Sequence, residues 1–421
     1  MRTILANSGV LSAGSLTAQA LAAVAYLLAA RALRPDQFGF AVGLIGLVTL
    51  ATSAADFGIN AMSIRRLAED SSDSLAFTRT LSAKITLAAL LSFLWVLGCT
   101  LLYAHGLDPN EQAVVPLLAV YLVLNVISTT LAVPLMSQRR MRPVAAVSAL
   151  EKLVALVVTV VALADSTTRV PALALGLSAG AVCSAALYAT LLPLSMRHLQ
   201  IPTVRQIVDL WHESVGFGIS TLAVQLQRGD VAVVGAISGT AAAGVFAVPA
   251  RLTNPLGAIP TALSAALFPH VAAIGASDRA FREAARATIV VLAFMACAFG
   301  LLFVGADQAV SGLVGPAYLA SVPVLRVYLA AMMVASANQP LAVYLQATHE
   351  EQYVARTVAL AALIGLGGVA AGAALAGAFG AAFGFAFQQV MIFAALAARL
   401  WGTSHVGGRL ALLDQQTHAD S

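Results

Sequence analysis

The chain has 421 residues, of which 60% are hydrophobic and only 10% are charged. Soluble domains carry about 25% charged residues, so this composition excludes a water-soluble globular protein. The net charge of +4 comes almost wholly from arginine and includes no long basic run, which argues against a nucleic-acid-binding face. The composition therefore predicts an all-α protein that crosses a lipid bilayer many times.

Long apolar runs separated by short polar segments predict about twelve transmembrane helices. Each run is close to the roughly 20 residues that cross a bilayer, and none alternates in the short units of a membrane β-barrel. The predicted spans are residues 8–30, 38–61, 82–104, 113–136, 143–164, 171–194, 212–235, 244–270, 286–304, 322–346, 354–375 and 379–400.

The distribution of Lys and Arg predicts the side of the membrane that each loop faces. With the N-terminus in the cytoplasm, sixteen basic residues, Lys84 among them, fall on the cytoplasmic side. Only three fall outside: Arg31, Arg34 and Arg169. Because cytoplasmic loops carry an excess of basic residues, this bias predicts an even number of spans with both termini in the cytoplasm.

A weak repeat near the midpoint divides the predicted spans into two halves. Phe-Ala-Val at residues 40–42 recurs at 246–248, each time after the first span of a half. Six spans return the chain to its starting side, so the halves would be parallel lobes around a central cavity. We expect these lobes at residues 1–207 and 208–401, followed by a polar, disordered cytoplasmic tail at 402–421.

The sequence lacks the motifs of common catalytic sites. Neither of its two lysines, Lys84 and Lys152, stands in a phosphate-binding loop, so ATP hydrolysis at a Walker site is not expected. The seven histidines form no zinc motif, and the three cysteines lack metal-binding spacing. Because every loop is also short, we expect a transporter rather than an enzyme, with no metal and no cofactor.

Polar side chains inside the predicted spans mark the candidate site, because a charge within a bilayer is costly and generally faces a cavity or a partner. The candidates for substrate binding are Arg228, Arg251, Arg326, Lys152, Arg31, Gln225 and Asn338. The candidates for ion coupling are Asp56, Glu151 and Asp230. The small excess of basic groups favours an anionic ligand, since guanidinium matches phosphate oxygens with paired donors.

Each of these residues also has a structural interpretation. Arg228 would pair with Asp230 or extend toward the membrane surface, the other arginines would anchor helix ends, and Asp56 would pack between helices. Glu151 and Lys152 are adjacent in sequence and point about 100° apart, so we do not expect them to pair with each other.

The stretch LLAARALRPDQFGFAVGLIGLVTLATSAADFGINAMSIRRLAE, residues 27–69, resembles a known family. It is similar to the opening of bacterial polysaccharide flippases of the multidrug/oligosaccharidyl-lipid/polysaccharide exporter superfamily. There the first span ends in Ala-Arg-x-Leu-x-Pro-acidic-x-aromatic-Gly, and the second ends in a basic stretch. The matching positions are Arg31, Leu33, Pro35, Asp36, Phe38 and Gly39 in the first pattern, and Asp56, Gly58, Arg65, Arg66 and Leu67 in the second.

This resemblance implies an inner-membrane flippase that works by alternating access. Its substrate would be a polyprenyl-diphosphate-linked oligosaccharide, moved from the cytoplasmic to the outer leaflet for polysaccharide biosynthesis such as exopolysaccharide or O-antigen. The resemblance also implies coupling to a proton or sodium gradient. The expected partners are the lipid-linked anionic glycan, membrane lipid, a glycan polymerase and other polysaccharide-assembly proteins.

Two alternatives stay open. The first is a drug or metabolite exporter of the same superfamily, which would prefer an acidic cavity. The second is a membrane glycan polymerase or transferase, although the sequence has neither a large outer loop nor an acidic pair beside one.

Overall fold

The computed structural model describes the backbone of residues 2–69, 74–103, 106, 108–193, 196, 202–274, 278–348 and 350–419. Within these ranges the chain forms helices and turns and contains no β-strand. The helices of the first half are α1 (Arg2–Ala32), α2 (Pro35–Asp56), α3 (Ile59–Glu69), α4 (Ser74–Tyr103), α5 (Pro109–Gln112), α6 (Val114–Leu131), α7 (Val133–Ser137), α8 (Met141–Ala164) and α9 (Ala172–Leu191).

The second half continues the same pattern of long helices joined by short connections. It contains α10 (Val204–Leu226), the 3₁₀ turn η2 (Gln227–Gly229), α11 (Asp230–Ser238), α12 (Thr240–Ile274), α13 (Asp278–Val304), α14 (Ala306–Leu313), the 3₁₀ turn η3 (Pro316–Tyr318), α15 (Ser321–Ala347) and α16 (Glu351–Ala419).

The predicted spans fall on these helices in order, which confirms an all-α membrane protein with many spans. The seventh predicted span covers α10, η2 and α11. The last two fall on the arms of α16, whose backbone leaves the helical conformation at Ala376 and Gly377.

Judged by length and hydropathy alone, eight helical stretches of the described residues could cross a membrane, or nine if one bent pair counts as a span. This number is below twelve partly because both arms of α16 lie in one stretch, Glu351–Trp401. In addition, α10 begins with charged residues and α11 is short.

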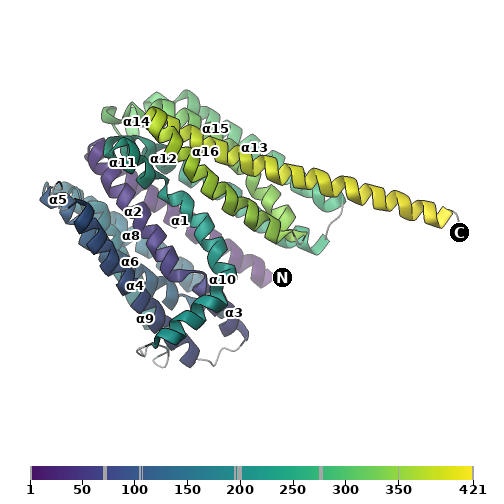
Figure 1. Ribbon diagram of the computed structural model, residues 1–421, viewed down its shortest axis with the longest axis horizontal. Helices are drawn as coiled ribbons and strands as arrows, with labels where there is room; N and C mark the ends of the chain where they lie inside the picture. The colour runs from purple at the N-terminus through teal and green to yellow at the C-terminus, as the bar shows by residue number, and fades with distance from the viewer. Residues whose placement is uncertain are drawn as a thin grey trace.

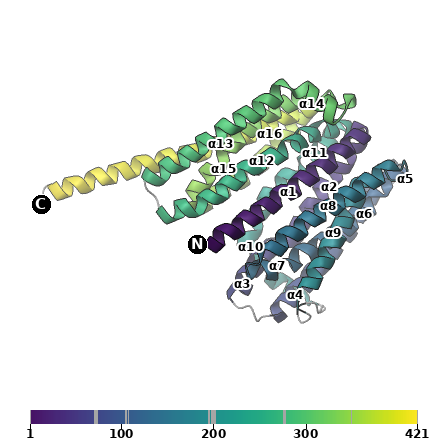
Figure 2. The same cartoon turned by 180° about the vertical axis from the view of Figure 1, so that it is seen from behind.

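The helices form two bundles (Figures 1 and 2). The N-terminal bundle contains α1, α2, α4, α6, α8 and α9, and the C-terminal bundle contains α11, α12, α13, α15 and α16. The bundles lie together at the end that carries α11 and α14, called here the α14 end. They diverge toward the opposite end, which carries α3 and is called the α3 end. Helix α10 contacts both α2 and α16. The predicted lobe boundary at residue 207 stays a prediction.

Backbone packing joins the bundles at the α14 end. A Cβ atom on Gly39 of α2 would lie 1.9 Å from the carbonyl oxygen of Thr240, and one on Gly244 of α12 would lie 2.0 Å from the carbonyl oxygen of Pro35. Only glycine allows two helices to approach so closely. The buried Tyr318 hydroxyl also donates a hydrogen bond of 3.1 Å to the Leu33 carbonyl oxygen.

The prediction of a polar, disordered tail at residues 402–421 stays a prediction. Helix α16 continues to Ala419 and extends beyond the bundles (Figure 1). The segment RLALLDQQ within the tail is rich in residues of high helix propensity, which accounts for the continuation. Residues 420–421 lie outside the described residues.

Candidate functional site

A connected group of polar and aromatic side chains bridges the two bundles. We call it the inter-bundle cluster. Its members on the N-terminal bundle are Tyr26, Tyr121, Asn125, Glu151 and Lys152, and those on the C-terminal bundle are Asp230, Arg251 and Tyr328. The cluster therefore draws its side chains from α1, α6, α8, α11, α12 and α15.

Arg251 of α12 links the two sides of the cluster. The Cζ atom of its guanidinium lies 4.0 Å from the centroid of the Tyr26 ring on α1, which is a cation–π contact. Its Nε atom is buried and has no hydrogen-bond partner within the described residues. A buried donor without a partner is costly, so Arg251 retains hydrogen-bonding capacity that a ligand oxygen would satisfy.

Asp230 and Tyr328 accompany Arg251 on the C-terminal bundle. The Asp230 carboxylate is close enough to Arg251 to interact with it electrostatically, and Tyr328 is close enough to interact with both. The Asp230 Oδ1 atom accepts a hydrogen bond of 2.7 Å from the backbone N–H of Val231. The Tyr328 ring stacks on Phe385 with centroids 4.5 Å apart, which fixes the orientation of the ring.

On the N-terminal bundle the cluster is centred on the buried Tyr121 of α6. Asn125 donates a hydrogen bond of 2.6 Å from its Nδ2 atom to the Tyr121 hydroxyl. Tyr121 is also close enough to interact electrostatically with Tyr26, Glu151 and Lys152. This side of the cluster thus places a hydroxyl, an amide and the Glu151–Lys152 ion pair near Tyr26.

Glu151 and Lys152 form an ion pair with each other, so the prediction that these neighbours would not pair was wrong. The prediction used only the angle between their Cα–Cβ directions. Both side chains have several rotatable bonds, and their charged ends bend across that angle. Lys152 consequently enters the cluster already paired, whereas Arg251 does not.

Arg228 lies on η2, where the seventh predicted span is broken. Its backbone carbonyl packs against Gly46 of α2, on which a Cβ atom would lie 2.6 Å from that oxygen. The Arg228 side chain is exposed and forms no ion pair with Asp230 or with any other described residue. Nearby in α10, the buried Oε1 atom of Gln225 lacks a hydrogen-bond partner within the described residues.

Three other predicted residues make contacts away from this cluster. Arg31 donates a hydrogen bond of 2.7 Å to the Gly312 carbonyl oxygen at the α14 end, and so joins the two bundles there. Arg326 forms a 2.8 Å ion pair with Asp307 of α14. The Asn338 Nδ2 atom donates a hydrogen bond of 3.0 Å to the Gln389 carbonyl oxygen inside the C-terminal bundle.

Asp56 belongs to a second charged group, which we call the paired-charge centre and which sequence reasoning missed. The Nζ atom of Lys84, whose side chain is fully buried, lies 2.6 Å from the Asp56 Oδ1 atom and 2.6 Å from the Asn60 Oδ1 atom. Lys84 was counted among the basic residues of the cytoplasmic side although it stands within the predicted span 82–104, and in the structure it lies inside the candidate span Leu75–Leu101. A lysine followed directly by the apolar run ITLAAL was the available signal.

Sequence reasoning also missed the three tyrosines of the inter-bundle cluster. Tyr26, Tyr121 and Tyr328 each stand within a predicted span, where a phenolic hydroxyl needs a hydrogen-bond partner. That requirement was a usable signal. No group of His, Cys, Asp and Glu suited to hold a metal ion occurs among the residues that the structure describes.

The model of the family described as "Polysaccharide biosynthesis protein" matches residues 4–274. The search of curated proteins gives no match. The solved structures that resemble this chain include "Lipid II flippase MurJ, inward closed conformation", with a TM-score of 0.73 and 10% identity over 93% of this chain and 87% of that one.

Two other solved structures show the same architecture. An "inward-facing conformation of a multidrug resistance MATE family transporter of the MOP superfamily" has a TM-score of 0.67 and 14% identity over 93% of this chain and 95% of that one. A MOP superfamily transporter from Pyrococcus furiosus, described as having a binding pocket of reverse polarity, has a TM-score of 0.61 and 14% identity over 95% of each chain. These identities establish the fold alone. The family match, which covers more than half of the chain, shows that this protein belongs to the polysaccharide biosynthesis protein family and has the fold of MOP superfamily transporters.

Proposed function

We propose that this protein is a flippase rather than an enzyme, and that it moves a polyprenyl-diphosphate-linked oligosaccharide across the membrane for polysaccharide biosynthesis. The diphosphate would bind in the inter-bundle cluster, and the two bundles would expose this cluster to each leaflet in turn. Family membership supports the pathway, and the likeness to a lipid flippase and to MATE transporters supports the mode of action.

Arg251 is the observation on which this proposal chiefly depends. It is a partly buried cation between the bundles, it contacts the opposite bundle through Tyr26, and its Nε atom has no partner within the described residues. Guanidinium donors match phosphate oxygens in pairs, so a diphosphate would satisfy them. Arg228 on η2 is a second available cation, and Lys152 would add to the positive field despite its pairing with Glu151.

The distribution of basic residues supports one orientation of the protein in the membrane. The α3 end carries Arg65, Arg66 and Arg79, whereas Arg31 and Arg34 are at the α14 end. By the positive-inside rule we propose that the α3 end, and with it both termini, faces the cytoplasm of a bacterial inner membrane. The bundles are joined at the α14 end and diverge at the α3 end, so this arrangement corresponds to an inward-facing state that receives the lipid from the cytoplasmic leaflet.

The decisive experiment compares variants of two arginines in proteoliposomes that contain a lipid-linked oligosaccharide. We expect Arg251→Ala to reduce flipping at least about tenfold, the effect of losing one charge-assisted interaction with phosphate. Arg251→Lys should restore only part of the rate, because an ammonium group lacks the paired donors. Arg326→Ala is the matched control, because the Nε atom of Arg326 is likewise buried without a partner in the described residues, whereas its Nη2 atom is paired with Asp307 away from the inter-bundle cluster. This variant should flip at the normal rate.

The outcome separates the proposal from its alternatives. Normal flipping by Arg251→Ala would contradict the role of this cation. Transport of cationic drugs without flipping of the lipid-linked glycan would instead identify an exporter.

In cells, loss of a flippase should leave single repeat units facing the cytoplasm, whereas loss of a polymerase should leave them facing outward. A proton or sodium dependence that disappears in Asp230→Asn or Glu151→Gln would identify the coupling residue.

A further inference from the structure

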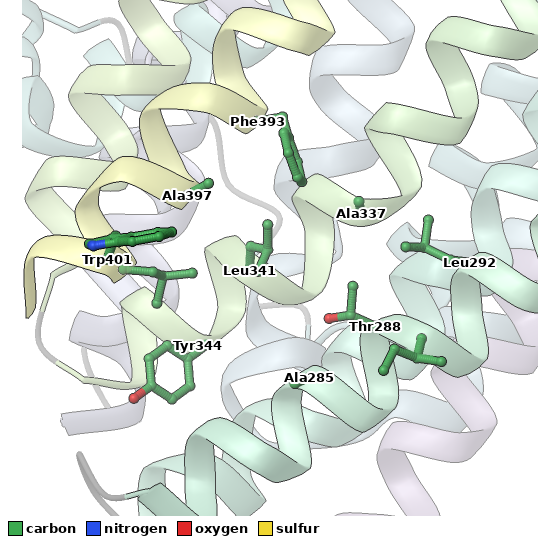
Figure 3. Close-up of a pocket in the computed structure, with 11 residues that line it drawn as sticks. Ala285, Thr288, Leu292, Ala337, Leu341, Tyr344, Phe393, Ala397 and Trp401 are labelled. Carbon is green, nitrogen blue, oxygen red and sulfur yellow. The ribbon is translucent and has the colours of Figure 1, made fainter. Parts of the chain in front are cut away.

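An apolar cavity of about 410 Å³ lies inside the C-terminal bundle, apart from the inter-bundle cluster. Its wall comes from α13, α15 and the second arm of α16, whose side chains face a shared space (Figure 3). Ala285 and Leu292 belong to α13, Ala337 and Leu341 to α15, and Phe393 and Ala397 to α16. Among the residues that the structure describes, no charged side chain lines this cavity. The volume falls within the range of small-ligand sites, and the lining excludes a charged or strongly polar ligand.

The cavity lies at the depth of the cytoplasmic leaflet, given the orientation proposed above. Its lining residues come from the start of α13, the end of α15 and the last turns of α16 inside the predicted membrane span. Trp401 forms one edge of the wall, and tryptophan is enriched at the boundary between lipid and water. Arg399, two residues earlier, forms an exposed ion pair with Glu350, so charged groups mark the same boundary.

Several side chains that line the cavity are both apolar and exposed. Ile289 and Trp401, which line it, are 65% and 71% exposed, and Phe393 is exposed as well. Large apolar side chains that are exposed within membrane-spanning helices face lipid tails. A lipid hydrocarbon chain can therefore pass from the bilayer core into the cavity without crossing a polar surface.

We propose that this cavity binds the isoprenoid chain of the lipid-linked substrate while its diphosphate is held at the inter-bundle cluster. This inference rests on the proposed function. Helix α15 contributes to both sites: Tyr328 belongs to the cluster, and Ala337, which lines the cavity, is about 14 Å farther along the helix. The small alanines between bulky side chains give the wall an uneven surface, which suits the methyl branches of an isoprenoid chain.

The test is photo-crosslinking in proteoliposomes with a diazirine-bearing polyprenyl phosphate, followed by peptide mapping. We expect the probe to label peptides of α13, α15 and α16 that line the cavity. Ala397→Phe would fill the cavity and should reduce this labelling about tenfold, the loss expected when about two methylene groups leave an apolar site. Ala398→Phe is the matched control, because Ala398 is the exposed neighbour that does not line the cavity, and it should label normally.

Ala285→Leu provides a second way to fill the cavity, from a different helix, and should give the same loss as Ala397→Phe if that variant folds poorly. Undiminished labelling in both variants would overturn the inference. Equal labelling by a diazirine-bearing phospholipid would also overturn it, since the cavity would then be a general lipid site. If Arg251→Ala abolishes flipping but the cavity stays unlabelled, the tail site fails and the proposed function stands. If the cavity is labelled but the wild-type protein moves no lipid-linked glycan, the proposed function fails instead.

Discussion

The two charged regions of this molecule satisfy their charges in opposite ways. In the paired-charge centre, Lys84 is fully buried and contacts both Asp56 and Asn60. In the inter-bundle cluster, Arg251 contacts an aromatic ring and keeps a buried Nε atom without a partner in the described residues. Isolated charges are costly within a bilayer, so a complete set of partners indicates a structural role. For a guanidinium that lies between the two bundles, we interpret an incomplete set as a site that a ligand completes. The two regions should therefore respond differently to mutation.

The largest effect on stability is expected when the paired-charge centre loses one partner. Lys84→Met leaves the Asp56 carboxylate partly buried without its cation, and should lower the free energy of unfolding by about 3–5 kcal/mol. Denaturant unfolding of the purified protein in detergent would measure this loss. The double variant Lys84→Met/Asp56→Leu should recover most of it, because no unpaired charge remains. A single variant as stable as the wild type would contradict the structural role of this pair.

A smaller loss is expected from the third member of the same centre. Asn60→Ala removes one hydrogen-bond acceptor from the Lys84 ammonium but leaves Asp56 in place, so unfolding should become about 1.5–3 kcal/mol easier. The same unfolding measurement applies. If Asn60→Ala proved more harmful than Lys84→Met, the ion pair would not be the main contribution to this centre.

The inter-bundle cluster should show the reverse pattern, with a small effect on stability and a large effect on transport. Arg251→Ala loses the cation–π contact with Tyr26, worth about 0.5–2 kcal/mol, and the electrostatic interaction with Asp230, whose carboxylate keeps its hydrogen bond from the Val231 N–H. The total loss should therefore stay below that of Lys84→Met. Unfolding and flipping measured on one preparation would show whether the two properties separate. A large loss of stability would instead assign Arg251 to the structural group together with Lys84.

The smallest effect is expected for the exposed pair of Arg326 and Asp307. Arg326→Ala should change the free energy of unfolding by less than about 1 kcal/mol, because water and salt screen exposed ion pairs. Flipping should be unchanged. Reduced flipping at normal stability would return Arg326 to the set of substrate-binding residues.

The sequence predicted the helices well because hydropathy is a local property. An apolar run such as Val114–Leu131 requires a membrane helix wherever it packs, and the short polar segments locate the connections. The site depended on tertiary contacts, and only part of it was predicted. Arg251 and Asp230 were identified because a charge within a span is energetically costly. The contact with Tyr26 comes from a helix of the other bundle, and no pattern in the neighbouring sequence predicts it.

Charge alone also failed to separate structural residues from available ones. Lys84 and Arg251 are both basic residues inside spans, yet the first is fully paired and the second is not. That difference depends on which helix lies opposite, and no spacing in the sequence specifies it. For Glu151 and Lys152 the prediction was that no ion pair forms, but the two side chains are flexible enough to bend toward each other and pair.

The contact between Gly39 and Gly244 has a mechanical consequence. Backbone meets backbone at this point, so the two helices leave no room for side chains or a lipid between them. In the proposed cycle, exposure of the inter-bundle cluster to the outer leaflet would require Gly39 and Gly244 to separate. Their contact would then act as an outer seal, and its close backbone packing would set how tightly the inward-facing state is closed on that side.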